Sequence, residues 1–194
     1  IISEFGTPNN GGLGEFRVSE NVGSLTNLPL DTGVPQGNSQ IKFSDFYSKR
    51  LNQVVDLYSI GNGSTRQDAK DRWNNGNVHI VGSTKTGKTQ PPDTQDDRVI
   101  INVNSTISSA KGTQTHCALK TGTWDSGTIL EIEIGTSGKL YGSGGNGGSG
   151  GSANNGKGGD GQTGSSALGI QYACTVNNLG VIQSGYGGGG GGGG

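Results

Sequence analysis

The chain has 194 residues, of which 28% are hydrophobic, 15% are charged, 6% are aromatic and 40 are glycine. Its 14 basic and 15 acidic residues give a formal net charge of −1, which excludes a protein that binds nucleic acid or acidic lipid through a broad basic surface. No stretch approaches the ~18 apolar residues that a membrane-spanning helix needs, and the first residues lack a signal-peptide pattern. Because the sequence does not begin with methionine, we expect a processed or truncated product.

Composition divides the chain into three predicted parts, namely 1–60, 61–141 and 142–194. The first part is rich in turn-forming proline and glycine, and it includes a predicted helix that begins at Ser44. Phe43, Phe46, Tyr47 and Leu51 lie at roughly helical spacing and form one apolar stripe, which a strand around Val54–Tyr58 follows. We interpret residues 1–60 as a docking or connector segment.

The middle part, residues 61–141, predicts β structure. Its β-branched runs at 78–81, 98–103 and 128–134 are typical of strands. The last run alternates apolar residues with Glu131 and Glu133, so one face is expected to be buried and the other hydrated. The predicted fold is mainly β and consists of a small antiparallel β-sandwich-like module. Trp73 and Trp124 are expected to anchor the core of this module.

The glycine-rich end has a period of three. Its side chains recur at Ser143, Asn146 and Ser149, and again at Lys157, Asp160 and Thr163, and the chain ends in eight glycines. Polyproline II geometry has three residues per turn and no internal hydrogen bonds, so every third side chain projects from one edge. We therefore predict a bundle of polyglycine II helices over 142–194.

In this hypothesis the two segments with side chains lie outside and the bare glycine run lies inside. Eight residues at ~3.1 Å each would span roughly 25 Å. The alternative is a flexible glycine-rich coil, whereas collagen is excluded because no proline follows Pro92. The predicted core run consists of Gly187, Gly188, Gly189, Gly190, Gly191, Gly192, Gly193 and Gly194.

One segment matches a nucleotide-binding motif. Residues 82–89, GSTKTGKT, fit the P-loop pattern and follow a predicted strand. A P-loop requires a helix directly after it, and here Pro91 and Pro92 prevent one. We therefore interpret the match as coincidental and expect a loop.

The remaining polar groups indicate no cofactor and no metal. Asp93, Asp96 and Asp97 could bind calcium, but such loop carboxylates are usually solvated. His79 and His116 have neither zinc spacing nor a place in a triad. We expect no catalytic, cofactor-binding or metal-binding residues.

Two further pairs of residues could have either a structural role or a chemical one. Glu131 and Glu133 share one strand face, which is usually a solvated face, although paired carboxylates could also serve a glycosidase. Cys117 and Cys174 allow one disulfide at most, and buried free thiols are the ordinary interpretation. Whether the two cysteines pair stays open.

The order of several short motifs resembles structural virion proteins of tailed phages, especially fibre proteins of myoviruses that infect marine cyanobacteria. The N-terminal motifs include LPLDTGVP at 28–35, SQIKFSDFYSK at 39–49 and LNQVVD at 51–56. Later motifs are CALKTG at 117–122, GKLYG at 138–142 and GYG at 185–187. The glycine-rich end also resembles the distal adhesins of T-even-like phages, in which polyglycine II sandwiches support receptor-binding loops.

This resemblance implies a non-enzymatic tail-fibre or tip protein that attaches a phage to its host. It implies a homotrimer located in the virion and assembled in the host cytoplasm. Its partners would be other tail or baseplate proteins and a bacterial surface glycan or outer-membrane protein. Phe43, Phe46 and Tyr47 would then dock the chain to the particle.

Tyr141, Tyr172 and Tyr186 are the candidate receptor contacts, because a tyrosine ring offers sugar a flat face and a polar hydroxyl. The same rings could instead pack against the glycine helices. Two other functions stay open: a head, neck or collar fibre that decorates the particle, and a depolymerase of surface glycan that uses Glu131 or Glu133.

Overall fold

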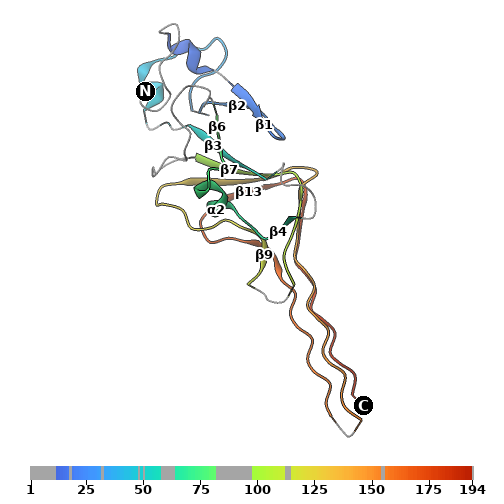
Figure 1. Cartoon of the computed structure of the whole chain (residues 1–194). Coiled ribbons are helices and arrows are strands. Elements are labelled where there is room, and N and C mark those ends of the chain that lie inside the picture. The colour runs from blue at the N-terminus through green and yellow to red at the C-terminus, as the bar shows by residue number, and fades with distance from the viewer. Residues whose placement is uncertain are drawn as a thin grey trace.

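The structure is a computed structural model. It describes residues 12–17, 19–31, 33–47, 49, 51–57, 64–81, 98–111, 115–153 and 156–193. Figure 1 shows a β-rich body from which a thin extension of the C-terminal chain projects. The mainly β fold predicted from the sequence is confirmed.

The strands of the body stack into three sheets that the chain visits in turn. The first sheet contains β3 (Asn52–Asp56), β7 (Arg98–Val103), β10 (Ile129–Ile134) and β13 (Thr175–Asn178), with β6 (His79–Ile80) at one edge. The second sheet contains β4 (Ser64–Thr65), β8 (Thr106–Ser108), β11 (Lys139–Tyr141) and β14 (Val181–Gln183). The third sheet contains β5 (Gln67–Asp68), β9 (Cys117–Lys120) and β12 (Ser166–Gly169).

Neighbouring strands in these sheets are parallel, so the antiparallel sandwich predicted from the sequence is wrong. β10 pairs in parallel with both β7 and β13, and β11 pairs in parallel with both β8 and β14. Only the edge strand β6 is antiparallel to its neighbour in the first sheet. Parallel strands need long crossovers, and here the strands of the other two sheets make them. The body is therefore a β-solenoid with three faces.

The interior of the solenoid holds the larger of two apolar clusters. Leu130, Ile132 and Ile134 of β10 point into it, as their alternation with Glu131 and Glu133 predicts. On the outer face, the Arg98 guanidinium donates to both carboxylate oxygens of Glu131, at 3.1 and 2.7 Å. The sequence pattern predicts this alternation, but it does not predict the direction of the neighbouring strands.

The first coil carries a short helix, α2 (Ala69–Asn74), for which Asp68 is the N-cap. Trp73 of this helix packs edge-on against Trp124 with ring centroids 5.5 Å apart, and its Nε1 donates to Oε1 of Gln53 at 2.7 Å. The Lys70 ammonium lies 3.9 Å from the Trp73 ring and 4.6 Å from the Trp124 ring. Both tryptophans are buried, so their predicted role in the core is confirmed.

A second layer covers the outer face of the first sheet. Its elements are η1 (Leu13–Arg17), β1 (Ser19–Val22), β2 (Leu25–Pro29) and η2 (Phe43–Phe46). Phe16 and Phe46 pack there with Val54 of β3 and Ile100 of β7 in the second apolar cluster. The helix predicted at Ser44 is only one turn of 3-10 helix, η2. Within the described residues no helix is long and apolar enough to cross a membrane.

Candidate functional site

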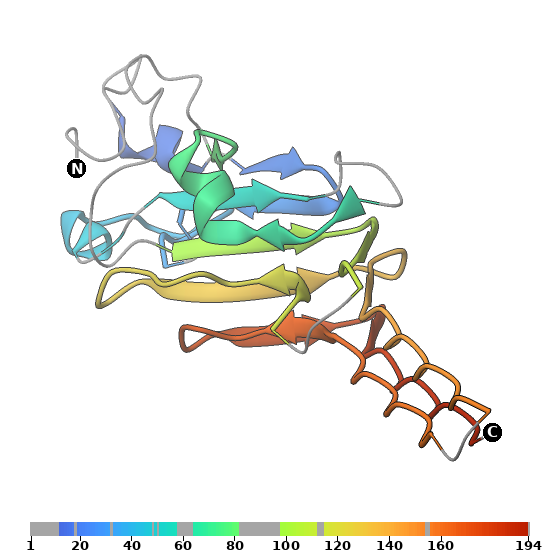
Figure 2. The same ribbon diagram turned by 60° about the horizontal axis from the view of Figure 1, so that its bottom comes forward.

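Three glycine-rich segments form the extension, and they lie side by side along its length (Figure 2). We call residues 142–151, 156–165 and 185–193 the first, second and third glycine segments. The first leaves the solenoid after β11, the second returns to β12, and the third follows β14. The first and third therefore run in the same direction and the second runs against them.

Backbone hydrogen bonds join the three segments at every third residue. The first donates to the third, as from Gly148 to Gly189 at 2.8 Å, and the third donates to the second, as from Gly188 to Gln162 at 2.7 Å. The second donates to the first, as from Gly159 to Ser149 at 2.8 Å. The bonds thus close a ring around the axis of the extension, and they repeat along it.

The glycines at these contacts leave no space for a side chain. A Cβ atom at Gly145 would lie 1.8 Å from the carbonyl oxygen of Gln162, and one at Gly188 would lie 2.0 Å from that of Asn146. None of the described glycines in the three segments has a φ in the left-handed region, so space and not backbone conformation requires glycine here. The nine glycines that a Cβ would bring within 2.4 Å of another segment are 142, 145, 148, 158, 161, 164, 185, 188 and 191.

The predicted core run is only partly enclosed. Of its members, Gly188 and Gly191 face the other two segments, whereas Gly187, Gly189, Gly190, Gly192 and Gly193 are exposed. Gly194 lies outside the described residues.

Buried serine hydroxyls join the extension to the solenoid. The amide of Ser143 donates to Oγ of Ser109 at 2.7 Å and to Oγ of Ser165 at 2.8 Å, and the two hydroxyls contact each other. Ser165 also donates to the carbonyl oxygen of Ser143 at 3.1 Å. This serine cluster thus links the end of β8 to the first and second glycine segments.

Ser109→Ala is expected to lower the free energy of unfolding by about 1–3 kcal/mol, because it leaves buried polar groups without partners. The urea midpoint should fall, and amide exchange at Ser143 should accelerate. Ser137→Ala, at an exposed serine, is the control and should change neither. Equal midpoints for the two variants would contradict a structural role for the cluster.

The three candidate receptor tyrosines have different environments. Tyr141 is half-buried at the end of β11, and the Tyr172 hydroxyl donates to the carbonyl oxygen of Asp125 at 2.9 Å. Tyr186, at the start of the third glycine segment, is 77% exposed. Of the three, Tyr186 alone presents most of its ring to solvent.

The three aromatic residues predicted to dock the chain differ in how deeply their side chains are buried. Phe46 is only 5% exposed and packs edge-on against Phe16 with ring centroids 5.4 Å apart. Phe43 and Tyr47 are 67% and 74% exposed. Phe46 thus supports the turn of η2, and its two aromatic neighbours face outward.

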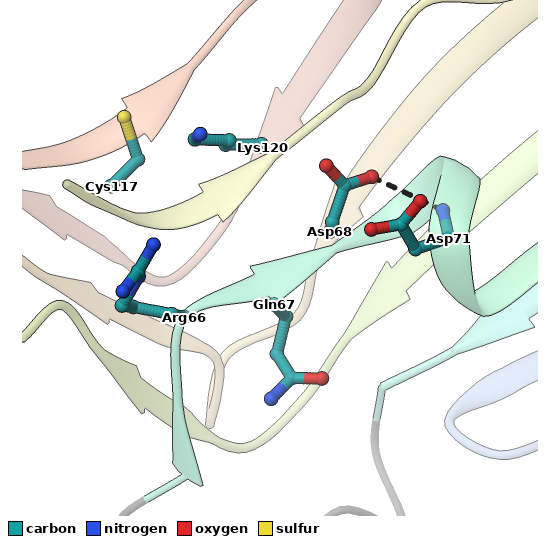
Figure 3. Close-up of a pocket in the computed structure, with 6 residues that line it drawn as sticks. All are labelled: Arg66, Gln67, Asp68, Asp71, Cys117 and Lys120. Atoms are coloured by element: carbon teal, nitrogen blue, oxygen red, sulfur yellow. Dashed lines mark hydrogen bonds between the residues drawn. The ribbon is translucent and has the colours of Figure 1, made fainter. Parts of the chain in front are cut away.

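A polar pocket of about 380 Å³ lies on the third sheet and was not predicted from the sequence. Figure 3 shows Arg66 and Lys120 on one side of it and Asp68 and Asp71 on the other. Gln67 and Cys117 complete the lining. Its residues come from segments about fifty positions apart, which the parallel pairing of β5 with β9 brings together. The pocket offers charges of both signs to a polar ligand.

The other candidate residues are placed as follows. Glu131 is bound to Arg98, and Glu133 accepts a hydrogen bond from the side chain of Asn177. His79 contacts the Glu20 carboxylate, whereas Nδ1 of His116 is buried without a partner among the described residues. The described part of the chain contains no group of three or more His, Cys, Asp and Glu side chains placed to hold a metal ion.

Cys117 and Cys174 are both free thiols. Partial burial raises the pKa of the Cys174 thiol. The P-loop-like residues 82–89 and the acidic residues Asp93, Asp96 and Asp97 lie outside the described residues.

A family model described as phage tail fibre adhesin Gp38 matches residues 64–194. The match begins at β4, continues through the solenoid and includes all three glycine segments. No curated protein and no solved structure matches the chain. Because the matched region is more than half of the sequence, the chain belongs to the phage tail fibre adhesin Gp38 family.

Proposed function

We propose that the three glycine segments form a polyglycine II shaft, which gives this tail-fibre adhesin a thin and stiff end for host attachment. The ring of hydrogen bonds with a period of three carries this proposal, since polyglycine II has three residues per turn and must find its hydrogen-bond partners in neighbouring helices. The lack of space for a Cβ at nine glycines supports it as well. A flexible coil would need neither feature.

The N-terminal segment, residues 1–60, is proposed to dock the adhesin to other proteins of the virion tail. The exposed rings of Phe43 and Tyr47 support this role, because aromatic side chains are enriched at protein interfaces. Phe46 supports this surface from its buried side, because its ring packs against Phe16 and holds the 3-10 turn η2 in place.

The host-binding surface is proposed to lie near the shaft, with Tyr186 as the principal contact. Its exposed ring supports this choice, since it can stack on a sugar or pack on an outer-membrane protein. Tyr141 and Tyr172 belong to the same hypothesis but contribute less, because the hydroxyl of Tyr172 is bound to the solenoid and Tyr141 is half-buried.

We also propose that the adhesin is a homotrimer.

Purified adhesin, added to host cells before phage, is expected to inhibit adsorption in a saturable manner, because it occupies the receptor. Tyr186→Ala should weaken this inhibition, whereas Tyr47→Ala should leave it unchanged. Adsorption is measured by counting free phage. A folded protein that never inhibits adsorption would favour the decoration fibre of the head, neck or collar.

The same two variants, placed in the phage, should have the opposite effects on assembly. Tyr47→Ala is expected to reduce the amount of adhesin in purified particles, and Tyr186→Ala is not. Immunoblots of particles measure this. If both variants change the same property, docking and receptor binding are not separated as proposed.

The family suggests a non-enzymatic structural protein. A depolymerase is tested directly by Glu131→Gln and Glu133→Gln. If purified adhesin releases reducing ends from host glycan and either variant abolishes the release, the protein would be a depolymerase as well as an attachment protein.

A further inference from the structure

The polar pocket on the third sheet holds four charged side chains that do not pair with one another. Arg66 and Lys120 lie on one side, and Asp68 and Asp71 lie on the other (Figure 3). Among the described residues, no ion pair joins either cation to either carboxylate. Separated charges of opposite sign attract a ligand that carries both signs, because each half of the ligand then has a counter-charge.

Arg66 turns the chain between two sheets in a backbone conformation that favours glycine. It lies between β4 of the second sheet and β5 of the third, with a φ of 46°. The other described residues with a left-handed φ are five glycines and Asn27, residue types that adopt this region readily. Glycine would make the same corner at lower cost, so the side chain of Arg66 is expected to have a use beyond the turn.

The carboxylate of Asp68 is held in place on the opposite wall. Its Oδ1 accepts from the amides of Lys70 and Asp71, at 3.0 and 3.2 Å, and a Cβ atom at Gly122 would lie 3.0 Å from the same oxygen. Asp68 also pairs with Lys120 in the parallel register of β5 with β9. A carboxylate that is already fixed loses little conformational freedom when it binds a ligand. This wall of the pocket is therefore formed before any ligand arrives.

The charges and the size of the pocket indicate the chemical class of its ligand. A guanidinium and an ammonium recognise phosphate or carboxylate, and the carboxylates opposite recognise a protonated amine. The volume of about 380 Å³ accommodates one sugar ring with its substituents, and it exceeds what a two-carbon zwitterion fills. An amino sugar with an acidic substituent combines both charges on a ring of suitable size.

We propose that this pocket binds an amino sugar that carries a phosphate or carboxylate group, as a unit of the host's surface glycan. The anion lies against Arg66 and Lys120, and the ammonium lies against Asp68 and Asp71. The source of the sugar rests on the proposed role in host attachment, whereas the chemistry of the pocket does not. Because the pocket lies on the solenoid, it is a second contact site, separate from Tyr186 on the shaft.

Four related monosaccharides test the need for both charges. Glucosamine 6-phosphate has an ammonium and a phosphate, glucose 6-phosphate lacks the amine, glucosamine lacks the phosphate, and N-acetylglucosamine 6-phosphate has an uncharged amide instead of the amine. An NMR titration of the full chain in mildly acidic buffer is expected to show saturable binding of glucosamine 6-phosphate. Each of the other three should bind roughly tenfold more weakly, the usual loss for one charged hydrogen bond. No binding, or equal affinity for all four sugars, would overturn the proposal.

Variants on the two sides of the pocket should change its selectivity in different ways. Lys120→Gln is expected to reduce the preference for glucosamine 6-phosphate over glucosamine, and Asp71→Asn is expected to reduce the preference over glucose 6-phosphate. A purely structural role for either residue would lower all affinities together. Lys139→Gln and Asp160→Asn, at exposed residues outside the pocket, are the controls and should change neither ratio. Unchanged ratios in Lys120→Gln and Asp71→Asn would contradict the assigned contacts.

Arg66→Gly separates ligand binding from folding. Its denaturation midpoint is expected to stay the same or to rise, because glycine adopts the left-handed φ without strain. Its affinity for glucosamine 6-phosphate should nevertheless fall roughly tenfold, because the guanidinium is lost. If the variant retains its affinity, Arg66 does not contact the sugar and the proposal fails.

Competition identifies the source of the sugar. Polysaccharide isolated from the host surface should displace glucosamine 6-phosphate, and failure to do so would overturn the assignment to the host glycan. Tyr186→Ala should bind glucosamine 6-phosphate with unchanged affinity while it weakens the inhibition of adsorption. Loss of sugar selectivity with intact inhibition of adsorption would contradict the pocket alone, whereas an adhesin that binds the sugar but never inhibits adsorption would contradict the proposed attachment role.

Discussion

Gly148→Ala is expected to open the shaft to proteolysis, whereas Ser149→Ala leaves it resistant. The added methyl carbon at residue 148 would lie 1.8 Å from the carbonyl oxygen of Gly159 and 2.7 Å from the amide nitrogen of Gly191. Both atoms are backbone, so no side-chain rotation relieves the overlap and the segments must separate. Overpacking of this kind typically costs about 1–3 kcal/mol. When the segments separate, the backbone hydrogen bonds on either side of residue 148 would also be lost.

A glycyl-glycine endopeptidase provides the measurement, since the run from Gly187 to Gly193 is its natural target sequence within the chain. The unaltered shaft and the Ser149→Ala variant should resist cleavage, because Ser149 is exposed and its backbone carbonyl still accepts from Gly159. The Gly148→Ala variant should be cut. Equal cleavage of all three proteins would contradict an ordered shaft and favour a flexible glycine-rich coil.

Trp73→Ala is expected to lower the free energy of unfolding by about 3–5 kcal/mol, the usual cost of removing a buried tryptophan. The substitution deletes the ring that packs against Trp124 and removes the donor to Gln53, whose amide is itself buried. Lys70 also loses one of the two rings against which its ammonium lies. Chemical denaturation, followed by the fluorescence of Trp124, measures the change.

Phe43→Ala is the matched control for this substitution. It also removes an aromatic ring, but from a side chain that is 67% exposed, so the midpoint should change little. If the two variants unfold at the same denaturant concentration, α2 is not an integral part of the solenoid core. Docking to the virion is the property that Phe43→Ala should reduce.

Local features of this protein follow directly from its sequence. Alternation of apolar residues with Glu131 and Glu133 identified β10 and its buried face, and the run from Arg98 to Val103 identified β7. The period of three from Ser143 to Ser149 anticipated the period of the hydrogen bonds between the glycine segments. Each of these is a repeat along a single segment, and the backbone geometry of that segment sets its period.

The sequence could not indicate which strands are neighbours or in which direction they run. Strand alternation is the same in parallel and antiparallel sheets, and the two partners of β7 in the first sheet, β3 and β10, are distant in the sequence: Arg98 pairs with Asn52 of β3 and with Ile129 of β10. The antiparallel sandwich predicted from the strand runs was therefore the wrong architecture. The polar pocket between β5 and β9 was missed for the same reason, since only the parallel register brings Asp68 beside Lys120.

By itself, the sequence determined a mainly β chain with an ordered pattern at its glycine-rich end, because these properties depend on local periodicity and composition. Only the tertiary structure decided that Phe46 is buried while Phe43 and Tyr47 are exposed, and which glycines of the run from Gly187 to Gly193 must be glycine. Those distinctions depend on atoms from distant segments, such as Phe16 beside Phe46 and the carbonyl of Asn146 beside Gly188. Such contacts exist only after the chain has folded, and no spacing within one segment encodes them.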